Sequence, residues 1–244
     1  MGTAKKYKLT DETIQVSGHT LHRIEALTDF CNAHKGEKGG FVESEDNLSQ
    51  SNDCWVYDDA KVFSNAMVSD DALVFGNAQV YDKARVFGEA FVFNDAVVCG
   101  DAEVRDNAKV CGYARVWGNA SIYGNAKVCG HARVWGNASI YGNAKVYGNA
   151  KVCGYARVYG DARVYGDAKV ESASDYIVFK NWWSSGRYFT WTRSNNMWSV
   201  GCFYGTGEGL IAKAYKDSKL SGREYERVVK YVESILKDNE NDKR

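Results

Sequence analysis

The stretch YARVWGNASIYGNAKVCG, residues 113–130, is followed directly by HARVWGNASIYGNAKVYG, residues 131–148, and the two copies differ at only two positions. Each copy holds three units of the form A-x-V-x-G-[ND]. Outward from this stretch, alanine occupies every sixth position from Ala60 to Ala168 without a break. A short fixed period of this kind indicates a structure built from stacked repeats.

Alternation within each unit predicts a strand. Successive side chains of a strand point to opposite sides. Alanine and the valine two residues later therefore fill the interior, while the residue after each of them faces out. Glycine and asparagine make the turn, because both tolerate positive φ. Three units form one coil of 18 residues, and coils stack at roughly 4.8 Å. Residues 51–171 are predicted to form a three-sided parallel β-helix.

This pattern resembles the hexapeptide-repeat, left-handed β-helix superfamily typified by bacterial acyltransferases. The resemblance implies a left-handed coil, where the usual crossover rule would give the other hand, and trimers about the rod axis. The whole chain also resembles proteins encoded in bacteriophage and prophage genomes, through its N-terminal segment, its repeats and the GCFYGT stretch (residues 201–206) before its C-terminal helices. That second resemblance carries no settled activity.

The flanking segments are predicted to be separate units in a mainly β chain. Residues 1–50 are expected to form an N-terminal β cap with strands over 7–16 and 20–26, because uncapped ladder ends recruit other chains. Residues 172–244 are expected to form a small α+β C-terminal domain with three aromatic strands and then two helices. The first helix should begin near Thr206, and the second with a capping box from Ser221 to Glu224.

Composition sets limits on partners and compartment. Lys plus Arg equals Asp plus Glu at 31 each, so no net charge draws the chain to nucleic acid or membrane. No apolar run reaches the roughly 18 residues of a membrane span, and the N-terminus has no apolar signal core. We expect a cytoplasmic protein, in the host cytoplasm if it is phage-encoded. Nucleic acid is a disfavoured partner.

The seven cysteines include no CxxC pair. This pattern argues against a complete disulfide set and against a zinc site, so no metal and no cofactor is predicted. Cys111 and Cys129 should lie on adjacent coils, close enough to bond, but free thiols are expected in a reducing compartment.

Catalysis is not predicted, and no catalytic residue is assigned. The hexapeptide enzymes use a histidine at a subunit interface and bind acyl-CoA along the coils. His131 is the only histidine in the repeats, and filling a corner is its simpler role. The repeat phase never slips, so no inserted loop shapes a pocket. His19, His22 and His34 have no carboxylate or cysteine pattern around them in the sequence. An acyltransferase using acyl-CoA remains the alternative.

Outward positions supply two kinds of candidate surface. Basic and aromatic residues on one face could bind a nucleotide or single-stranded nucleic acid, or could simply be favourable cross-strand pairs. These are Arg115, Trp117, Arg133 and Trp135. Apolar and tyrosine columns are oligomer-interface candidates, the apolar one because so large a patch calls for cover by the N-terminal segment or another subunit. These are Leu73, Phe75, Phe91, Phe93, Tyr123, Tyr141 and Tyr159. A homo-oligomer is predicted, with a trimer favoured.

The C-terminal domain concentrates residue types that are enriched at binding hot spots, although a small domain also needs large aromatics for its own core. Its ligand or partner candidates are Trp182, Trp183, Arg187, Tyr188, Trp191, Arg193, Trp198, Gly205 and Thr206. The last two precede a helix N-terminus that could hold an anion. The predicted function is a non-enzymatic, phage-type binding or scaffold protein. Its oligomeric rod would present this domain to a host protein or a small ligand such as a nucleotide, as in counteracting a host defence. Nucleic-acid binding is the second alternative.

Overall fold

The computed structural model describes residues 5–30, 33–183 and 186–241. Residues 1–4 of the N-terminal segment, for which no signal core was predicted, therefore lie outside the described part. The chain divides into two compact units, residues 1–173 and 174–244, each described here by itself. None of the described helices is long and apolar enough to cross a membrane.

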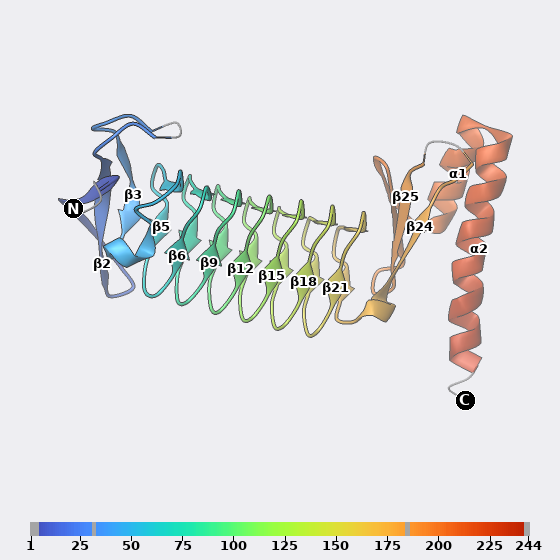
Figure 1. Cartoon of the computed structure of the whole chain (residues 1–244). Coiled ribbons are helices and arrows are strands. Elements are labelled where there is room, and N and C mark those ends of the chain that lie inside the picture. Colours follow the sequence, from blue (N-terminus) through green and yellow to red (C-terminus); the bar gives the residue numbers. More distant parts are fainter. Residues whose placement is uncertain (1–4, 31–32, 184–185, 242–244) are drawn as a thin grey trace. The chain divides into compact units, whose positions relative to one another are not determined.

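The first unit is a parallel β-solenoid of about seven turns with an antiparallel segment at its N-terminal end (Figure 1). It has three sheets, whose outward sides are called faces 1, 2 and 3. Face 1 belongs to the sheet β1 (Tyr7–Val16), β2 (His19–Ala26), β3 (Lys38–Val42), β5 (Lys61–Val62), β8 (Gln79–Val80), β11 (Val97–Val98), β14 (Arg115–Val116), β17 (Arg133–Val134), β20 (Lys151–Val152) and β23 (Lys169–Val170). Face 2 belongs to β4 (Trp55–Val56), β7 (Leu73–Val74), β10 (Phe91–Val92), β13 (Lys109–Val110), β16 (Lys127–Val128), β19 (Lys145–Val146) and β22 (Arg163–Val164). Face 3 belongs to β6 (Met67–Val68), β9 (Arg85–Val86), β12 (Glu103–Val104), β15 (Ser121–Ile122), β18 (Ser139–Ile140) and β21 (Arg157–Val158).

The interior of the solenoid confirms the prediction from alternation. Every repeat alanine from Ala60 to Ala168 is almost completely buried, as are the valines and isoleucines two positions later. Strands one coil apart pair in parallel with a register of 18 residues, as in Arg115 with Arg133. The hand of the coil stays a prediction from the resemblance.

The corners of the coil need positive φ at every sixth residue. Early coils meet this need with Asp58, Asp70, Asp82 and Asp106, whose φ values lie between 54° and 61°. Each of these carboxylates accepts a hydrogen bond from the backbone N–H of the glycine 18 residues later, at 2.9 to 3.1 Å. Later coils use glycine throughout. A Cβ at Gly136 would lie 3.1 Å from the carbonyl oxygen of the next coil's glycine, so a side chain at this corner would crowd the backbone of the next coil.

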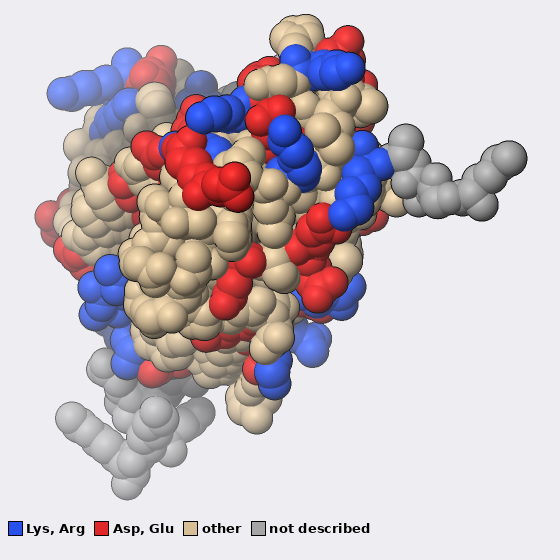
Figure 2. All heavy atoms as spheres, turned by 90° about the vertical axis from the view of Figure 1, so that its left-hand side faces the viewer, with Lys and Arg blue, Asp and Glu red and all other residues tan. Residues whose placement is uncertain are grey.

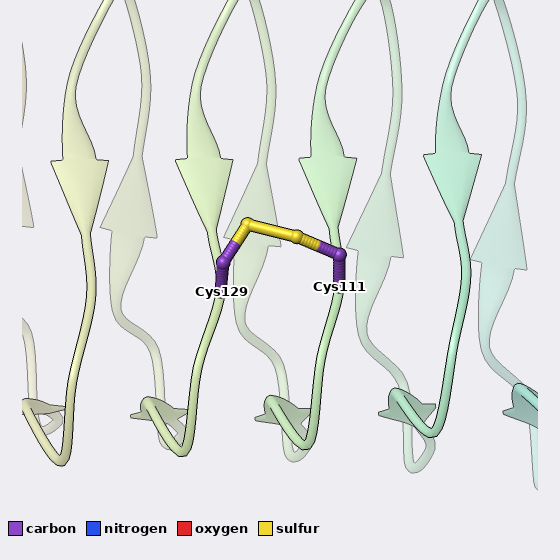
Figure 3. Close-up of a disulfide and its surroundings, with 2 residues drawn as sticks. All are labelled: Cys111 and Cys129. Carbon is purple, nitrogen blue, oxygen red and sulfur yellow. A yellow bond between two sulfur atoms is a disulfide. The ribbon is translucent and has the colours of Figure 1, made fainter.

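In-register stacking also governs the cysteines. Cys111 follows β13 and Cys129 follows β16, and their Cα atoms are 4.6 Å apart (Figure 3). The structure joins them as a disulfide, so the expectation of free thiols at these two positions was wrong. Among the described residues, Cys54, Cys99, Cys153 and Cys202 form no disulfide.

The N-terminal strands continue the ten-stranded sheet. β1 and β2 form an antiparallel hairpin, β2 pairs antiparallel with β3, and β3 pairs in parallel with β5. The short helix η1 (Glu45–Asn47) follows, and Nδ2 of Asn47 donates to the carbonyl oxygens of Ser64 and Ala66. Acidic and basic side chains intermingle over this end of the unit (Figure 2).

The second unit is an antiparallel sheet followed by two helices. The helix η2 (Ala173–Asp175) precedes its strands β24 (Tyr176–Lys180), β25 (Tyr188–Thr192), β26 (Met197–Val200) and β27 (Phe203–Gly205), and then come α1 (Gly207–Asp217) and α2 (Lys219–Asn241). Four strands form where three were expected. Thr206 is the N-cap of α1, and its Oγ1 accepts from the N–H of Gly209.

The start of α2 differs from the prediction. The helix begins at Lys219, before the expected capping box. Oγ of Ser218 accepts from the N–H of Ser221, so Ser218 takes the capping role that the sequence pattern assigned to Ser221. Two serines three residues apart both fit a cap, and only the tight turn after α1 decides between them.

Candidate functional site: a notch in the aromatic column of face 1

Outward side chains one coil apart stack on each other. The rings of Trp117 and Trp135 lie 5.0 Å apart at 5°, and those of Tyr123 and Tyr141 lie 4.9 Å apart at 3°. Tyr159 extends the second stack. The stacking repeat is thus about one coil, as expected for side chains carried by adjacent strands.

The aromatic column of face 1 is interrupted between two stacked pairs. Phe63 stacks on Tyr81 at 5.1 Å, and Trp117 stacks on Trp135, but the residue between the two pairs is Cys99. Tyr81 and Trp117 are two coils apart, which separates them by roughly 10 Å. The gap is a hollow of about 450 Å³ lined by Gln79, Tyr81, Val97, Cys99, Arg115, Trp117 and Arg133. We call it the Cys99 notch.

The notch explains how an uninterrupted repeat can still contain a pocket. The expectation that no pocket forms assumed that an inserted loop is needed to shape one. Here a small side chain between two large ones in the same column produces the hollow. The structure brings Arg115, Trp117 and Arg133 into it as neighbours, and Trp135 stands behind Trp117.

The floor of the notch is neutral at ordinary pH. The pKa of Tyr81 is raised to about 12, mainly by a side-chain hydrogen bond with Cys99 and to a lesser degree by burial. Burial raises the pKa of the Cys99 thiol. Both groups therefore stay protonated and polar, and neither offers a negative charge that would repel an anion.

The basic rim of the notch has no acidic partner. Arg115, Arg133 and Lys151 project from three successive strands, and none forms an ion pair with any residue that the structure describes. By contrast, Arg85 on face 3 is paired with Glu103 at 3.4 Å. Like charges one coil apart repel each other, so an anion bound between them would relieve this repulsion.

A second hollow continues the basic rim. It measures about 390 Å³ and is lined by His131, Arg133, Asn149, Lys151 and Asp167. Arg133 belongs to both hollows, which therefore adjoin at its side chain. The ring of His131 stacks on Tyr113 at 4.9 Å and forms no hydrogen bond within the described ranges, so no hydrogen-bond partner orients the ring as a general base would require.

The four apolar oligomer-interface candidates lie together on face 2, whereas the Tyr123 column follows the strands of face 3. Phe91 pairs with Leu73 in register, and Phe75 stacks on Phe93 at 4.8 Å. All four side chains are half-buried within this single chain, and Nζ of Lys109 lies 4.6 Å from the ring of Phe91. An interface at this patch, or at the Tyr123 column, stays a prediction.

The C-terminal candidates divide between core and surface. Trp191 and Trp198 are buried, each with 2% of its surface exposed, whereas Trp182 is 84% exposed. Trp183 packs against Phe189 and Tyr225. The remaining candidates lie on or near the surface: Arg187 and Arg193 are exposed, and Tyr188 and Gly205 are half-buried.

A histidine–carboxylate pair in the N-terminal segment has no counterpart in the sequence predictions. Nδ1 of His19 lies 2.9 Å from Oε1 of Glu43, and the other carboxylate oxygen accepts from the N–H of Ser64. Hydrogen bonding by His19 is the main cause that lowers the pKa of Glu43. The pair joins β2 to the end of β3, a contact that sequence spacing does not reveal.

The residues of the notch that the sequence reading missed are Gln79, Tyr81, Val97 and Cys99. Writing the outward residues in columns of 18 would have found them, because Cys99 is then a small residue between Tyr81 and Trp117.

Comparison with known proteins bears on the repeat alone. Residues 156–171 match a family model described as the YdcK beta solenoid repeat. No curated protein matches the chain. Together with the fold, the match shows a protein built from a repeating β-solenoid.

Proposed function

We propose that this protein binds a small aromatic anion, a planar ring that carries a phosphate or carboxylate group, in the Cys99 notch. A nucleotide is the natural representative of that class. The observation that carries the proposal is the gap in the face 1 column, where one ring is missing between Tyr81 and Trp117 and two unpaired arginines border the gap.

The ring of the ligand takes the place that an aromatic residue takes elsewhere in the column. Rings on adjacent coils stack at 4.9 to 5.3 Å, so the gap of two coils between Tyr81 and Trp117 accommodates one inserted ring. Stacking of a base on an aromatic side chain contributes about 1–3 kcal/mol. Trp117 is held in place from behind by Trp135, so little ordering of the protein is needed on binding.

The anionic group of the ligand is held by Arg115 and Arg133. Guanidinium groups offer planar, paired donors that match phosphate and carboxylate oxygens. Because Arg133 also lines the second hollow, a ring in the notch can carry its anion toward Lys151. Both arginines are exposed, so we expect the affinity to fall with salt.

This proposal develops the small-ligand form of the predicted binding protein, with the solenoid as a rigid scaffold. Oligomer formation, a host protein as partner, a phage origin and the counteracting of a host defence by sequestering a small molecule remain proposals that rest on the sequence and its resemblances. The acyltransferase alternative requires a hydrogen-bond partner that orients the ring of His131, and the described residues supply none. The nucleic-acid alternative predicts affinity that falls steeply with salt and rises with strand length.

Isothermal titration calorimetry of the full chain tests the proposal, with adenosine monophosphate, adenosine and inorganic phosphate as probes. We expect the monophosphate to bind at least tenfold more tightly than either of the other two, because only it engages both the rings and the arginines. Equal binding of inorganic phosphate would reduce the site to a basic surface and contradict the proposal.

The variant Cys99→Trp fills the gap with the side chain that the next two coils carry, and it should abolish binding without unfolding the solenoid. Cys153→Trp is the matched control, since Cys153 follows Trp135 in the same column but lines neither hollow. Thermal melting checks that both variants fold. Binding that survives Cys99→Trp would refute the proposed site.

A further inference from the structure

The C-terminal unit contains a pocket of its own. It measures about 260 Å³ and is lined by Trp191, Asn196, Trp198, Thr206, Gly207, Glu208, Val229, Val232, Glu233 and Leu236. Its walls come from β25, β26, the start of α1 and one side of α2. The site is independent of the Cys99 notch, since all its residues belong to the second unit.

One indole N–H at this pocket lacks an acceptor within the described chain. Trp198 is 2% exposed, and its Nε1 forms no hydrogen bond in the part of the chain that the structure describes. The neighbouring Trp191 is satisfied, because its Nε1 donates to Oδ1 of Asn196 at 2.8 Å. Because Trp198 lines the pocket, its indole N–H is available to an acceptor from outside the chain.

Gly207 keeps the space beside that donor open. A Cβ at this position would lie 3.3 Å from Nε1 of Trp198 and 2.7 Å from Cγ1 of Val229. Gly207 is also the first residue of α1, so the backbone N–H groups of Gly207 and Glu208 have no acceptor within the helix. The indole and the start of the helix therefore both bring N–H donors to the lining of the pocket.

The rest of the lining favours a ligand that has an apolar group and positive charge. Val229, Val232 and Leu236 supply an apolar wall from α2. Glu208 and Glu233 border the same pocket, and neither forms an ion pair with a described residue. Two free carboxylates disfavour a phosphate, so the acceptor is better supplied by a neutral carbonyl, with cationic groups beside it.

We propose that this pocket binds a basic segment of a partner protein. One large apolar side chain of that segment enters the pocket, its backbone carbonyl accepts from Nε1 of Trp198, and flanking lysine or arginine side chains face Glu208 and Glu233. Charge complementarity selects a basic partner. The buried apolar side chain supplies most of the affinity.

Three short peptides test this on the full chain: acetyl-Lys-Lys-Leu-Lys-Lys-amide, the same peptide with alanine for leucine, and acetyl-Glu-Glu-Leu-Glu-Glu-amide. Binding is followed by the ¹H–¹⁵N resonances of the indole N–H groups, with that of Trp198 assigned through Trp198→Phe. We expect the leucine peptide to move the Trp198 resonance, the alanine peptide to bind about tenfold more weakly, and the acidic peptide not to bind.

Charge reversal distinguishes the pocket from general attraction. Glu233→Lys should weaken binding of the leucine peptide at least fivefold, whereas Asp217→Lys, at the far end of α1 and outside the pocket lining, should leave it within twofold. Equal weakening by the two variants, equal affinity for the leucine and alanine peptides, or binding without movement of the Trp198 resonance would each overturn the proposal.

Discussion

A corner glycine gives the sharpest test of how the coils hold each other. Gly136 has φ 73°, and a Cβ there would lie 3.1 Å from O and 3.2 Å from N of Gly154 on the next coil. Gly160 has nearly the same backbone conformation, with φ 63°, but nothing lies within 4 Å of its Cβ position. The two positions therefore separate backbone strain from contact between coils.

The expected losses follow from those contacts. An L-residue in the left-handed region costs roughly 1–2 kcal/mol, and this cost applies to both Gly136→Ala and Gly160→Ala. Only Gly136→Ala must also move the neighbouring backbone, and overpacking of this kind costs about 1–3 kcal/mol. The free energy of unfolding should therefore fall at least about 1 kcal/mol further for Gly136→Ala than for Gly160→Ala.

Urea unfolding followed by far-ultraviolet circular dichroism measures the difference, provided the two variants share one m-value. Gly136→Asp is a useful third variant, because Asp106 occupies a corner with φ 58° and accepts from the N–H of the glycine one coil later. It should lose about 1 kcal/mol less than Gly136→Ala. Equal losses at Gly136 and Gly160 would refute the reasoning, since contact between coils would then contribute nothing at the corners.

Four further predictions concern other parts of the first unit. Phe91→Asp should give a monomer or an insoluble protein, and an unchanged oligomer in native mass spectrometry would remove face 2 as the interface. Asn47→Ala leaves two buried carbonyls without their donor and should lower the free energy of unfolding by about 2–3 kcal/mol; a loss under about 0.5 kcal/mol would argue against it. Cys111→Ser removes the disulfide and should cost up to about 3 kcal/mol, a difference that a reducing agent in the urea titration should erase. The hydrogen bond with His19 lowers the pKa of Glu43 in the folded state. The stability that the ionised Glu43 contributes is therefore complete above the ordinary pKa of 4.5 and is lost as the pH falls through the lowered pKa. The difference in melting temperature between the wild type and Glu43→Gln should narrow below about pH 4.5, and a constant difference would contradict this account.

The regular part of the fold follows from local rules, which is why it could be predicted. Ala60 and the alanines after it fit the narrow interior next to a valine, and the left-handed conformation at each corner favours glycine, aspartate or asparagine. These constraints act within six residues, and identical neighbours satisfy them repeatedly. The buried alanines and valines, and the column that holds Trp117 and Trp135, could be predicted for the same reason.

The notch was harder to predict because it depends on residues 18 positions apart. Nothing in the local sequence around Cys99 distinguishes it from any other outward residue. Its meaning comes from Tyr81 and Trp117 on the neighbouring coils. The pairing of His19 with Glu43 is similar, since it depends on how β2 lies beside β3.

In the C-terminal unit, residue type alone could not separate core from surface. Trp182 and Trp191 are both tryptophans in one aromatic stretch, yet the first is exposed and the second buried. The sheet decides this, because Trp191 lies on β25 and belongs to the core cluster shared with the two helices, whereas Trp182 lies between β24 and β25 and outside every strand. The turn after α1 decided the start of α2 in the same way.

The two nearly identical copies at residues 113–148 give the chain a place where its length can change during evolution. Unequal recombination between the copies would insert or delete 18 residues in frame, and every new junction would again join a coil to a coil of the same shape. Tyr81 and Cys99 of the notch lie in coils that have no duplicate, and each of the two copies carries the arginine and the tryptophan that border it, so such events would leave the notch in place. Natural variants of this protein should therefore differ in the number of coils after the notch and agree in the coils that build it.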